Sequence, residues 1–294
     1  MSDLSPGRAA PSSTLYVDVS GMHPVGVRPP LRKYVRGLWQ RRAFIVADSR
    51  ARTFTTNRDM LLGNLWLIGR PLLDGATYFV IFGLLFGARE GVENFVGFLL
   101  VGVFLFGYSS RSLSAGVAAI SSGRNLIRTF AFPRAVIPIA IWLRETLTSV
   151  PIILTLLVLV TAIPPHAKVS VWWALFPVVL LLQALFNLGV AFYSSRFGSV
   201  IPDVRVFVGF FSRLWMYGSG VMFSIESLSN GHPVAMAISE INPLYCVLEL
   251  ARDTLLYGSP GDAKLWIVLV TWAVVTPIFG FLYFWHGEEH YGRE

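Results

Sequence analysis

The sequence predicts an all-α polytopic membrane protein with six transmembrane helices, an amphipathic helix before them and a short helical hairpin between the last two. Three observations predict this class. Of the 294 residues, 54% are hydrophobic and only 14% are charged, whereas a soluble domain carries about 25% charged residues. Six apolar stretches are each long enough to cross a hydrocarbon core of about 30 Å. The basic residues gather in segments between alternate stretches, as the positive-inside rule expects.

The residues before the predicted spans divide into two parts. Residues 1–30 are rich in Pro, Gly and Ser and hold no apolar run long enough for a signal peptide, which predicts a flexible cytoplasmic tail. Residues 31–64 place apolar side chains on one helical stripe and basic side chains elsewhere. The stripe begins with Leu31, Val35, Leu38 and Trp39. It predicts an amphipathic interfacial helix on the cytoplasmic membrane surface, with a helix docked on a partner protein as the alternative.

The predicted six-span domain covers residues 65–285. Its spans are Leu65 to Phe86, Phe95 to Ile120, Ala135 to Ile163, Val171 to Tyr193, Val204 to Phe223 and Leu265 to Trp285. Residues 286–294 follow as a short cytoplasmic tail, which is polar enough that we expect it to be solvated.

The 24 Lys and Arg residues orient these spans. Ten of them precede Leu65, and six more fall on the same side, namely Arg124, Arg128, Arg134, Arg196, Arg205 and Arg293. The opposite side holds only Arg89, Lys168, Arg252 and Lys264. Because basic loops stay in the cytoplasm, both termini are predicted to be cytoplasmic. The membrane thereby explains the formal charge of +7, which gives no reason to expect a nucleic-acid partner.

The outer segment before the last span is too apolar for a plain linker and is expected to fold back towards the membrane. Asn242 followed by Pro243 has the pattern of an N-cap and a first helical residue. Gly258 suits the position after a C-cap. A weaker helical stretch precedes Asn242, so the pattern predicts a helical hairpin on the outer face.

Motifs for chemistry are weak in this chain. None of its lysines follows a glycine, so it lacks the phosphate-binding loop that an ATPase requires. His286, Glu289 and His290 match the zinc-binding spacing H-x-x-E-H, but they stand in a polar tail without further ligands. The single cysteine, Cys246, is expected to be an inert packing residue. We therefore predict no catalytic residue, no metal site and no cofactor in this chain.

Charged residues inside the predicted spans are the main functional signal, because an unpaired charge at that depth is costly. At 1.5 Å per residue, the charges that lie roughly 14 Å from the cytoplasmic ends of their helices are those of Asp74, Arg111, Arg144 and Arg213. Arg70 can pair with Asp74 on one helix face. Arg144 and Glu145 are adjacent in sequence, so each is expected to find its partner on another helix.

These charges have two interpretations. They form salt bridges that fix the packing, or Arg111 or Arg213 faces a conduit and binds an anionic group such as a diphosphate. Aromatic side chains on the first and fifth spans could stack on sugar rings, although lipid contact or core packing is their commoner use. The candidates for lining a conduit are Tyr78, Phe82, Arg111, Phe211, Arg213 and Trp215.

Three segments resemble ABC-2-type permeases, which export O-antigen, teichoic acid and related glycans. The run Leu62-Gly-Asn-Leu-Trp with Pro71-Leu72 resembles the start of that family's first span. Asn125 to Arg134, followed by Ile137-Pro138, resembles its cytoplasmic loop between spans two and three. Asn242-Pro-Leu-Tyr245 with Arg252 resembles its outer helix.

The resemblance implies roles for several segments. Ser121 to Arg134 would be a coupling helix seated in an ATPase, with contacts from Arg124, Asn125, Arg128, Phe132, Pro133 and Arg134; a loop that merely anchors the membrane is the alternative. Leu31 to Arg58 would be a gate helix at the cytoplasmic mouth. The outer-exit helix would use Asn242, Pro243, Tyr245 and Arg252.

The resemblance also implies partners and a substrate. Two copies of the chain would surround one conduit in a bacterial plasma membrane, with two nucleotide-binding subunits that carry ATP and Mg. The substrate would be a polysaccharide linked to undecaprenyl diphosphate, and the long tail and Arg-dominated charge are similar to actinobacterial members, which implies a cell-wall glycan such as galactan. The alternatives are an ABC-2 permease for a drug or small lipid, a membrane-embedded glycolipid enzyme, or a scaffold without transport.

Overall fold

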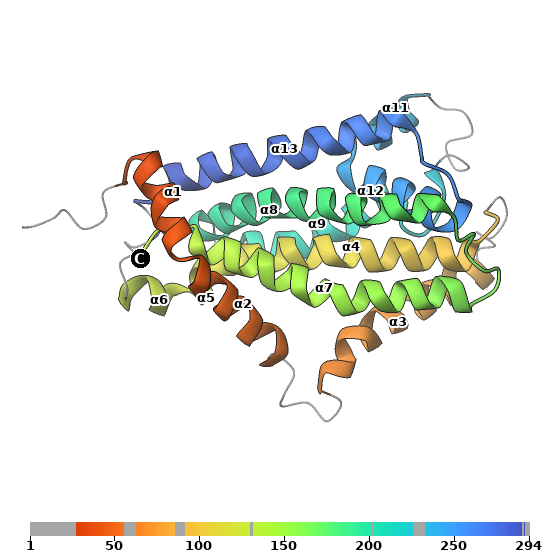
Figure 1. The fold of residues 1–294 in the computed structure, drawn as a ribbon, viewed down its shortest axis with the longest axis horizontal. Helices are drawn as coiled ribbons and strands as arrows, with labels where there is room; N and C mark the ends of the chain where they lie inside the picture. Colours follow the sequence, from red (N-terminus) through yellow and green to blue (C-terminus); the bar gives the residue numbers. More distant parts are fainter. Residues whose placement is uncertain are drawn as a thin grey trace, which may run out of the picture.

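The computed structural model describes residues 28–55, 63–85, 92–129, 132–201, 203–225, 233–289 and 291. These residues form a helical bundle, and no strand occurs among them (Figure 1). Helix α13 (Ala263–His286) ends at the same end of the bundle as α1 (Leu31–Gln40), whereas α11 (Pro233–Ile241) and α12 (Pro243–Arg252) lie at the opposite end. The termini themselves lie outside the described residues, so their cytoplasmic location stays a prediction.

Among the residues that the structure describes, five helices are long and apolar enough to cross a membrane. They are α3 with η2 (Trp66–Leu85), α4 (Phe95–Val117), α7 (Val136–Ala162), η3 with α8 (Val171–Val200) and α13 (Ala263–His286). The predicted fifth span is a shorter helix, α9 (Val204–Gly218), whose 15 residues would extend about 22 Å. The chain then turns at Gly220, where φ is +64°. The all-α polytopic class is confirmed, while the count of six spans stays a prediction.

Helix α4 is the centre of the bundle, and Val101 and Leu105 on it have no exposed surface. It packs against α7 and α8, and α13 covers the far side of α8 (Figure 1). A buried amide joins two of these helices: Gln183 Nε2 donates to Leu105 O at 2.8 Å and to Ser109 Oγ at 3.0 Å. Such interhelical bonds satisfy polar groups where lipid offers none.

Helix α8 continues to Val200, whereas the sequence predicted the fourth span to end at Tyr193. Polar residues extend it. Ser195 Oγ donates to Ala191 O at 2.6 Å, and Ser199 Oγ donates to Arg196 O at 2.7 Å. Because these hydroxyl groups bond within their own helix, a polar stretch follows the apolar one without a break.

The predicted interfacial helix is two helices, α1 and α2 (Arg42–Thr55), with a turn at Arg41. Their apolar residues do not share one environment. Leu31, Val35 and Trp39 are exposed, as expected for a lipid-facing stripe, but Leu38 packs against the bundle. Tyr34, which the stripe analysis did not include, is buried with only 1% of its surface exposed.

The predicted coupling segment, Ser121 to Arg134, begins at the end of α5 (Ala119–Ser122) and includes α6 (Arg124–Thr129). At the other end of the bundle, the helix predicted after Asn242 is confirmed as α12, and α11 precedes it. The weaker helical stretch predicted before Gly231 lies largely outside the described residues. Asn242 caps α12 with Oδ1, which accepts from Leu244 N at 3.1 Å, and Pro243 is its first residue. The π-helical turn η4 (Asp253–Tyr257) ends at Gly258, where φ is +65°.

The predicted solvated tail after α13 is wrong for the residues that the structure describes. Glu288 and Tyr291 are only 6% and 7% exposed. Tyr291 stacks on Phe284 with ring centroids 4.6 Å apart and donates its hydroxyl to Phe284 O at 3.0 Å. Two polar residues are thus buried by aromatic packing and tertiary hydrogen bonds that a window of sequence does not reveal. His290, part of the tested zinc spacing, lies outside the described residues.

Helices α8 and α13 approach so closely that a methyl group at Gly189 would overlap the backbone of Thr276 and lie 2.6 Å from Pro277 N. Gly189→Ala should therefore destabilise the protein by about 1–3 kcal/mol through overpacking, measured as a lower Tm in detergent. Gly209→Ala is the matched control, because nothing lies within 4 Å of the added atom there. Equal melting temperatures for the two variants would contradict this packing.

Candidate functional site: a polar groove between α3, α4 and α9

A cavity of about 510 Å³ lies between α3, α4 and α9. We call it the groove. Its polar lining comprises Arg70, Asp74, Tyr78, Ser110, Arg111, Ser114, Ser212 and Arg213. The structure therefore brings together three of the six predicted conduit residues, namely Tyr78, Arg111 and Arg213, from three different helices. A polar cavity beside membrane-spanning helices is the usual setting for intramembrane charges.

Small residues produce the groove. Gly107, Ser110 and Ser114 follow one another on α4 at helical spacing, so they share a face. On α9, Gly209 and Ser212 lie opposite, and the Ser110 and Ser212 hydroxyl oxygens are 2.7 Å apart. The sequence analysis did not include these serines. Their spacing on two apolar spans is the signal that could have found them.

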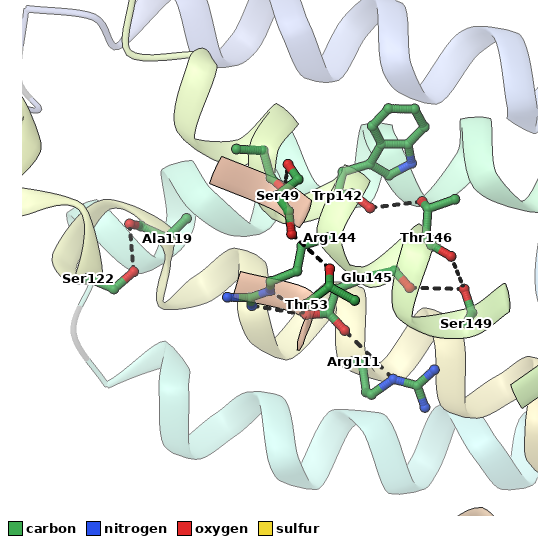
Figure 2. Close-up of polar contacts among 11 residues, drawn as sticks. Ser49, Thr53, Arg111, Ala119, Ser122, Trp142, Arg144, Glu145, Thr146 and Ser149 are labelled. Atoms are coloured by element: carbon green, nitrogen blue, oxygen red, sulfur yellow. Dashed lines mark hydrogen bonds and ion pairs between the residues drawn. The ribbon is translucent and has the colours of Figure 1, made fainter. Parts of the chain in front are cut away.

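The positive charge of Arg111 lies near the carboxylate of Glu145 on α7. Arg111 Nε lies 3.7 Å from Glu145 Oε2, and Arg144 Nη2 lies 2.9 Å from Glu145 Oε1 (Figure 2). The expectation that Arg144 and Glu145 both need partners on other helices is therefore half wrong. Arg144 is long enough to fold back onto its neighbour, while Glu145 also meets a second helix. One carboxylate thus stands between two guanidinium groups.

Two side-chain nitrogens of Arg111 have no hydrogen-bond partner among the described residues. These atoms, Nε and Nη2, are buried, and the 3.7 Å from Nε to Glu145 is too long for a hydrogen bond. Figure 2 shows its terminal nitrogens directed away from the Glu145 carboxylate. A buried unsatisfied donor costs about 1–3 kcal/mol. These nitrogens of Arg111 can therefore bind an acceptor that the described part of the chain does not supply.

Two further cavities share arginines with the groove or with each other. One of about 260 Å³ is lined by Arg70, Arg111, Arg144 and Glu145. Another of about 440 Å³ is lined by Arg144 together with residues of α2 and α6. Arg111 lines both the groove and the 260 Å³ cavity, and Arg144 lines both that cavity and the 440 Å³ one, so neighbouring cavities share a guanidinium group in their walls. The 440 Å³ cavity borders the predicted gate helix and the predicted coupling segment.

Arg70 and Asp74 both line the groove, but no ion pair joins these two described residues. The pair that the i and i+4 spacing allowed on α3 is thus not formed. Both side chains are exposed. Arg213 on α9 is exposed as well. The open side of the groove therefore presents charge that a lipid tail cannot solvate.

The other three conduit candidates do not line the groove. Trp215 packs edge to face against Phe106 and Phe186, with centroids 6.1 and 6.2 Å away, so it belongs to the core. Phe82 also packs against the core. Phe211 is 43% exposed beside Trp215. Aromatic character alone could not separate core packing from a conduit.

The predicted ATPase contacts lie in or directly after the coupling segment. Arg124 and Asn125 are exposed on α6, and the side chain of Arg128 lies outside the described set. Phe132 packs partly buried below α2 and α7. Pro133 approaches the gate helix so closely that a Cβ atom at Gly37 would lie 2.9 Å from its Cγ. The coupling segment and the gate helix are thus in direct contact.

Arg134 is engaged within the chain. Its backbone N donates to Glu288 Oε1 at 2.9 Å, and its guanidinium donates to Glu288 O. The sequence analysis assigned Arg134 only to a partner protein. Its interaction with the chain end was missed because the two residues are far apart in sequence.

The outer-exit residues form internal bonds. Asn242 Oδ1 accepts from Trp215 Nε1 at 3.1 Å, and its Nδ2 donates to Ser219 Oγ at 2.9 Å and to Gly218 O at 3.1 Å. These contacts fix the end of α9. Pro243 and Tyr245 are buried, so neither presents a surface to an exit path.

Arg252 is fully buried and organises the same region. Its Nη2 donates to Gly220 O at 2.9 Å, its Nη1 lies 2.7 Å from Glu249 Oε1, and its Cζ lies 3.3 Å from the centroid of the Phe98 ring. The expected role in an exit path is therefore replaced by an internal one. Arg252 holds the turn after α9, and α9 is one wall of the groove.

Comparison with known proteins gives the family. Residues 51–256 match the family described as ABC-2 type transporter. A similar protein of Myxococcus xanthus, named O-antigen export system permease protein RfbA, is 25% identical over 217 residues, which are 74% of this chain and 81% of that protein. A Klebsiella pneumoniae protein of the same name is 24% identical over 233 residues, which are 76% and 86% of the two chains.

Asp253, next to Arg252 in η4, makes stability depend on pH. Burial raises its pKa from 3.8 to about 6, with the neighbouring Glu249 adding to the rise. Because the folded pKa exceeds the unfolded one, the folded protein binds this proton more tightly, so stability falls as pH rises from about 4 to about 6. Asp253→Asn should therefore raise Tm at pH 7.5 and have little effect at pH 4.

Two units of pKa correspond to about 3 kcal/mol, and partial solvent screening reduces the expected gain to about 1 kcal/mol. Asp203→Asn is the control, since Asp203 is exposed and makes no side-chain cap bond. The same gain for Asp253→Asn at both pH values would contradict the assignment.

Proposed function

Because the chain belongs to the ABC-2 type transporter family, we propose that it is the membrane subunit of an ATP-driven exporter of a lipid-linked polysaccharide. The observation that carries the proposal is the groove, with Arg111 and Arg213 on opposite helices and unpaired donors on Arg111. The names of the similar proteins, which refer to O-antigen export, support the polysaccharide. The carrier we propose is undecaprenyl diphosphate.

Two kinds of contact would serve such a substrate. A diphosphate carries negative charge and several acceptor oxygens, and a guanidinium can bind two of them at once. Arg111 and Arg213 are therefore the proposed diphosphate contacts. Tyr78 lies along the same groove and offers an aromatic face to a sugar ring. Ser110, Ser114 and Ser212 would bond sugar hydroxyl groups without holding them tightly.

The open side of the groove leads us to propose a second copy of the chain. Arg70, Asp74 and Arg213 are exposed there, and charged side chains are costly against lipid. Val206, Phe207 and Phe210 on α9 are also exposed, at 82%, 62% and 57%. Two chains facing each other across α9 and α3 would enclose the charges in one conduit.

Energy would come from partners. The chain has no phosphate-binding loop, so two nucleotide-binding subunits would supply ATP and Mg and would dock on the coupling segment. Arg124 and Asn125 are the exposed contacts proposed there. Closure of the ATPases would push this segment and rotate the spans around the conduit. We propose a bacterial plasma membrane with both termini cytoplasmic, and a cell-wall glycan such as galactan as cargo.

The test uses the chain reconstituted in proteoliposomes with the product of any adjacent ATPase gene and a lipid-linked glycan. Arg213→Gln should lower transport at least about tenfold, the cost of one lost charged hydrogen bond. ATP hydrolysis and Tm should change little, because Arg213 is exposed. The readout is glycan translocated per ATP hydrolysed.

Lys168→Gln is the control for the loss of one positive charge, since Lys168 pairs with Glu93 on the surface and does not line the groove. Transport that is equally sensitive to both changes would contradict a substrate contact at Arg213. A wild-type chain that folds but neither associates with the ATPase nor moves glycan would overturn the proposed function itself.

A further inference from the structure

We propose that Glu288 is a positioning residue that ties the gate helix to the coupling segment, so that movement of one is transmitted to the other. The cluster consists of Tyr34, Arg134, Ala135 and Glu288, and we call it the clasp. This inference rests on the proposed function, because the movement to be transmitted would come from an ATPase that acts on the coupling segment. The clasp lies outside the groove, and two of its four members, Tyr34 and Glu288, lie outside residues 51–256, the segment that the family comparison matches.

The clasp is a closed ring of hydrogen bonds. Tyr34 OH donates to Glu288 Oε2 at 2.7 Å and accepts from Ala135 N at 3.0 Å. Glu288 Oε1 accepts from Arg134 N at 2.9 Å. The guanidinium of Arg134 also donates to the backbone oxygen of Glu288. Gate helix, coupling segment and chain end thus meet through two side chains.

The ring satisfies groups that would otherwise lack partners. Arg134 N and Ala135 N precede α7, so no carbonyl within that helix can accept from them. A carboxylate there also faces the positive end of the helix dipole. Burial and the nearby carboxylate raise the pKa of Tyr34, which keeps its hydroxyl protonated and able to donate. Each member therefore has a defined donor or acceptor role.

The residues beside Glu288 hold it in place from two directions. Tyr291 stacks on Phe284, which anchors the chain end to α13. Trp285 Nε1 donates to Pro29 O at 3.1 Å, and the Arg28 guanidinium lies 4.2 Å from the centroid of the Trp285 ring. Glu288 is thus fixed to α13 and to the chain that leads into α1. A fixed carboxylate can transmit displacement, whereas a mobile one could not.

A second contact makes the tie directional. Pro133 lies against Gly37 on α1, which is a steric contact that can push the gate helix but cannot pull it. The clasp supplies hydrogen bonds that resist separation. Together they make the first turns of α1 and the end of the coupling segment move as one body in both strokes of an ATPase cycle.

The test is Tyr34→Phe in the full chain, reconstituted with its ATPase. This change keeps the buried ring and removes both bonds of the Tyr34 hydroxyl. Tyr291→Phe is the matched control, because it removes another buried hydroxyl of the same region, one that bonds Phe284 O rather than the gate helix. We expect Tyr34→Phe to lower glycan transported per ATP hydrolysed about five- to tenfold, the fold-change of one or two lost bonds, while hydrolysis continues.

Tyr291→Phe should leave the ratio of glycan transported to ATP hydrolysed unchanged, even if it lowers Tm as much as Tyr34→Phe does. If the clasp were merely structural, equal losses of Tm would lower this ratio equally. If Tyr34→Phe does not fold, Glu288→Gln tests the same ring. If both single variants fold, the double variant should lose no more than the larger single loss. An unchanged ratio in every folded clasp variant would overturn the inference. A wild-type complex without ATP-dependent transport would instead overturn the proposed function.

Discussion

The surplus of positive charge around Glu145 is the feature on which the rest of this structure depends. Lipid provides no water for a charge, so polar groups inside a bundle must find partners there. Gln183 does so by joining α8 to α4 through Leu105 O, and Arg252 does so by joining α12 to the turn after α9 through Gly220 O. Around Glu145 the charges do not balance, because one carboxylate lies between two guanidinium groups, those of Arg111 and Arg144. This excess of positive charge lies beside the open groove. The packing of the bundle thereby leaves a positive charge where the proposed function needs one.

Most of the fold could be predicted from sequence, because membrane spans need only length and apolar character. The bounds of α4 and α13 agree with the predicted spans to within a few residues, and Asn242 caps its helix as its position before Pro243 indicated. The covering of the predicted interfacial helix could not be predicted in this way. A stripe of apolar residues looks alike whether lipid or protein covers it, so the burial of Tyr34 required tertiary structure.

The site was predicted less completely. Intramembrane charge singled out Arg111 and Arg213, since cost at depth is a property of the residue alone. The structure places both in the lining of the groove, and their contact with a substrate stays a prediction. Aromatic density did not separate Trp215 in the core from Tyr78 in the groove, because both uses favour the same residue types. Glu288 could not be found at all. Its partners are distant in sequence, and a polar residue after the last span resembles a solvated tail until the chain folds back.

The most direct test of the central claim, that the groove is a water-accessible path, is cysteine labelling in reconstituted membranes. The natural Cys246 is buried, so a Cys246→Ala background isolates introduced thiols. A membrane-impermeant cationic reagent should modify Ser114→Cys, which lines the groove, and block transport. It should not modify Leu154→Cys, which is 58% exposed on the outer surface of α7. Labelling of Ser114→Cys only by a lipid-soluble maleimide, in every state of the ATPase cycle, would contradict the account.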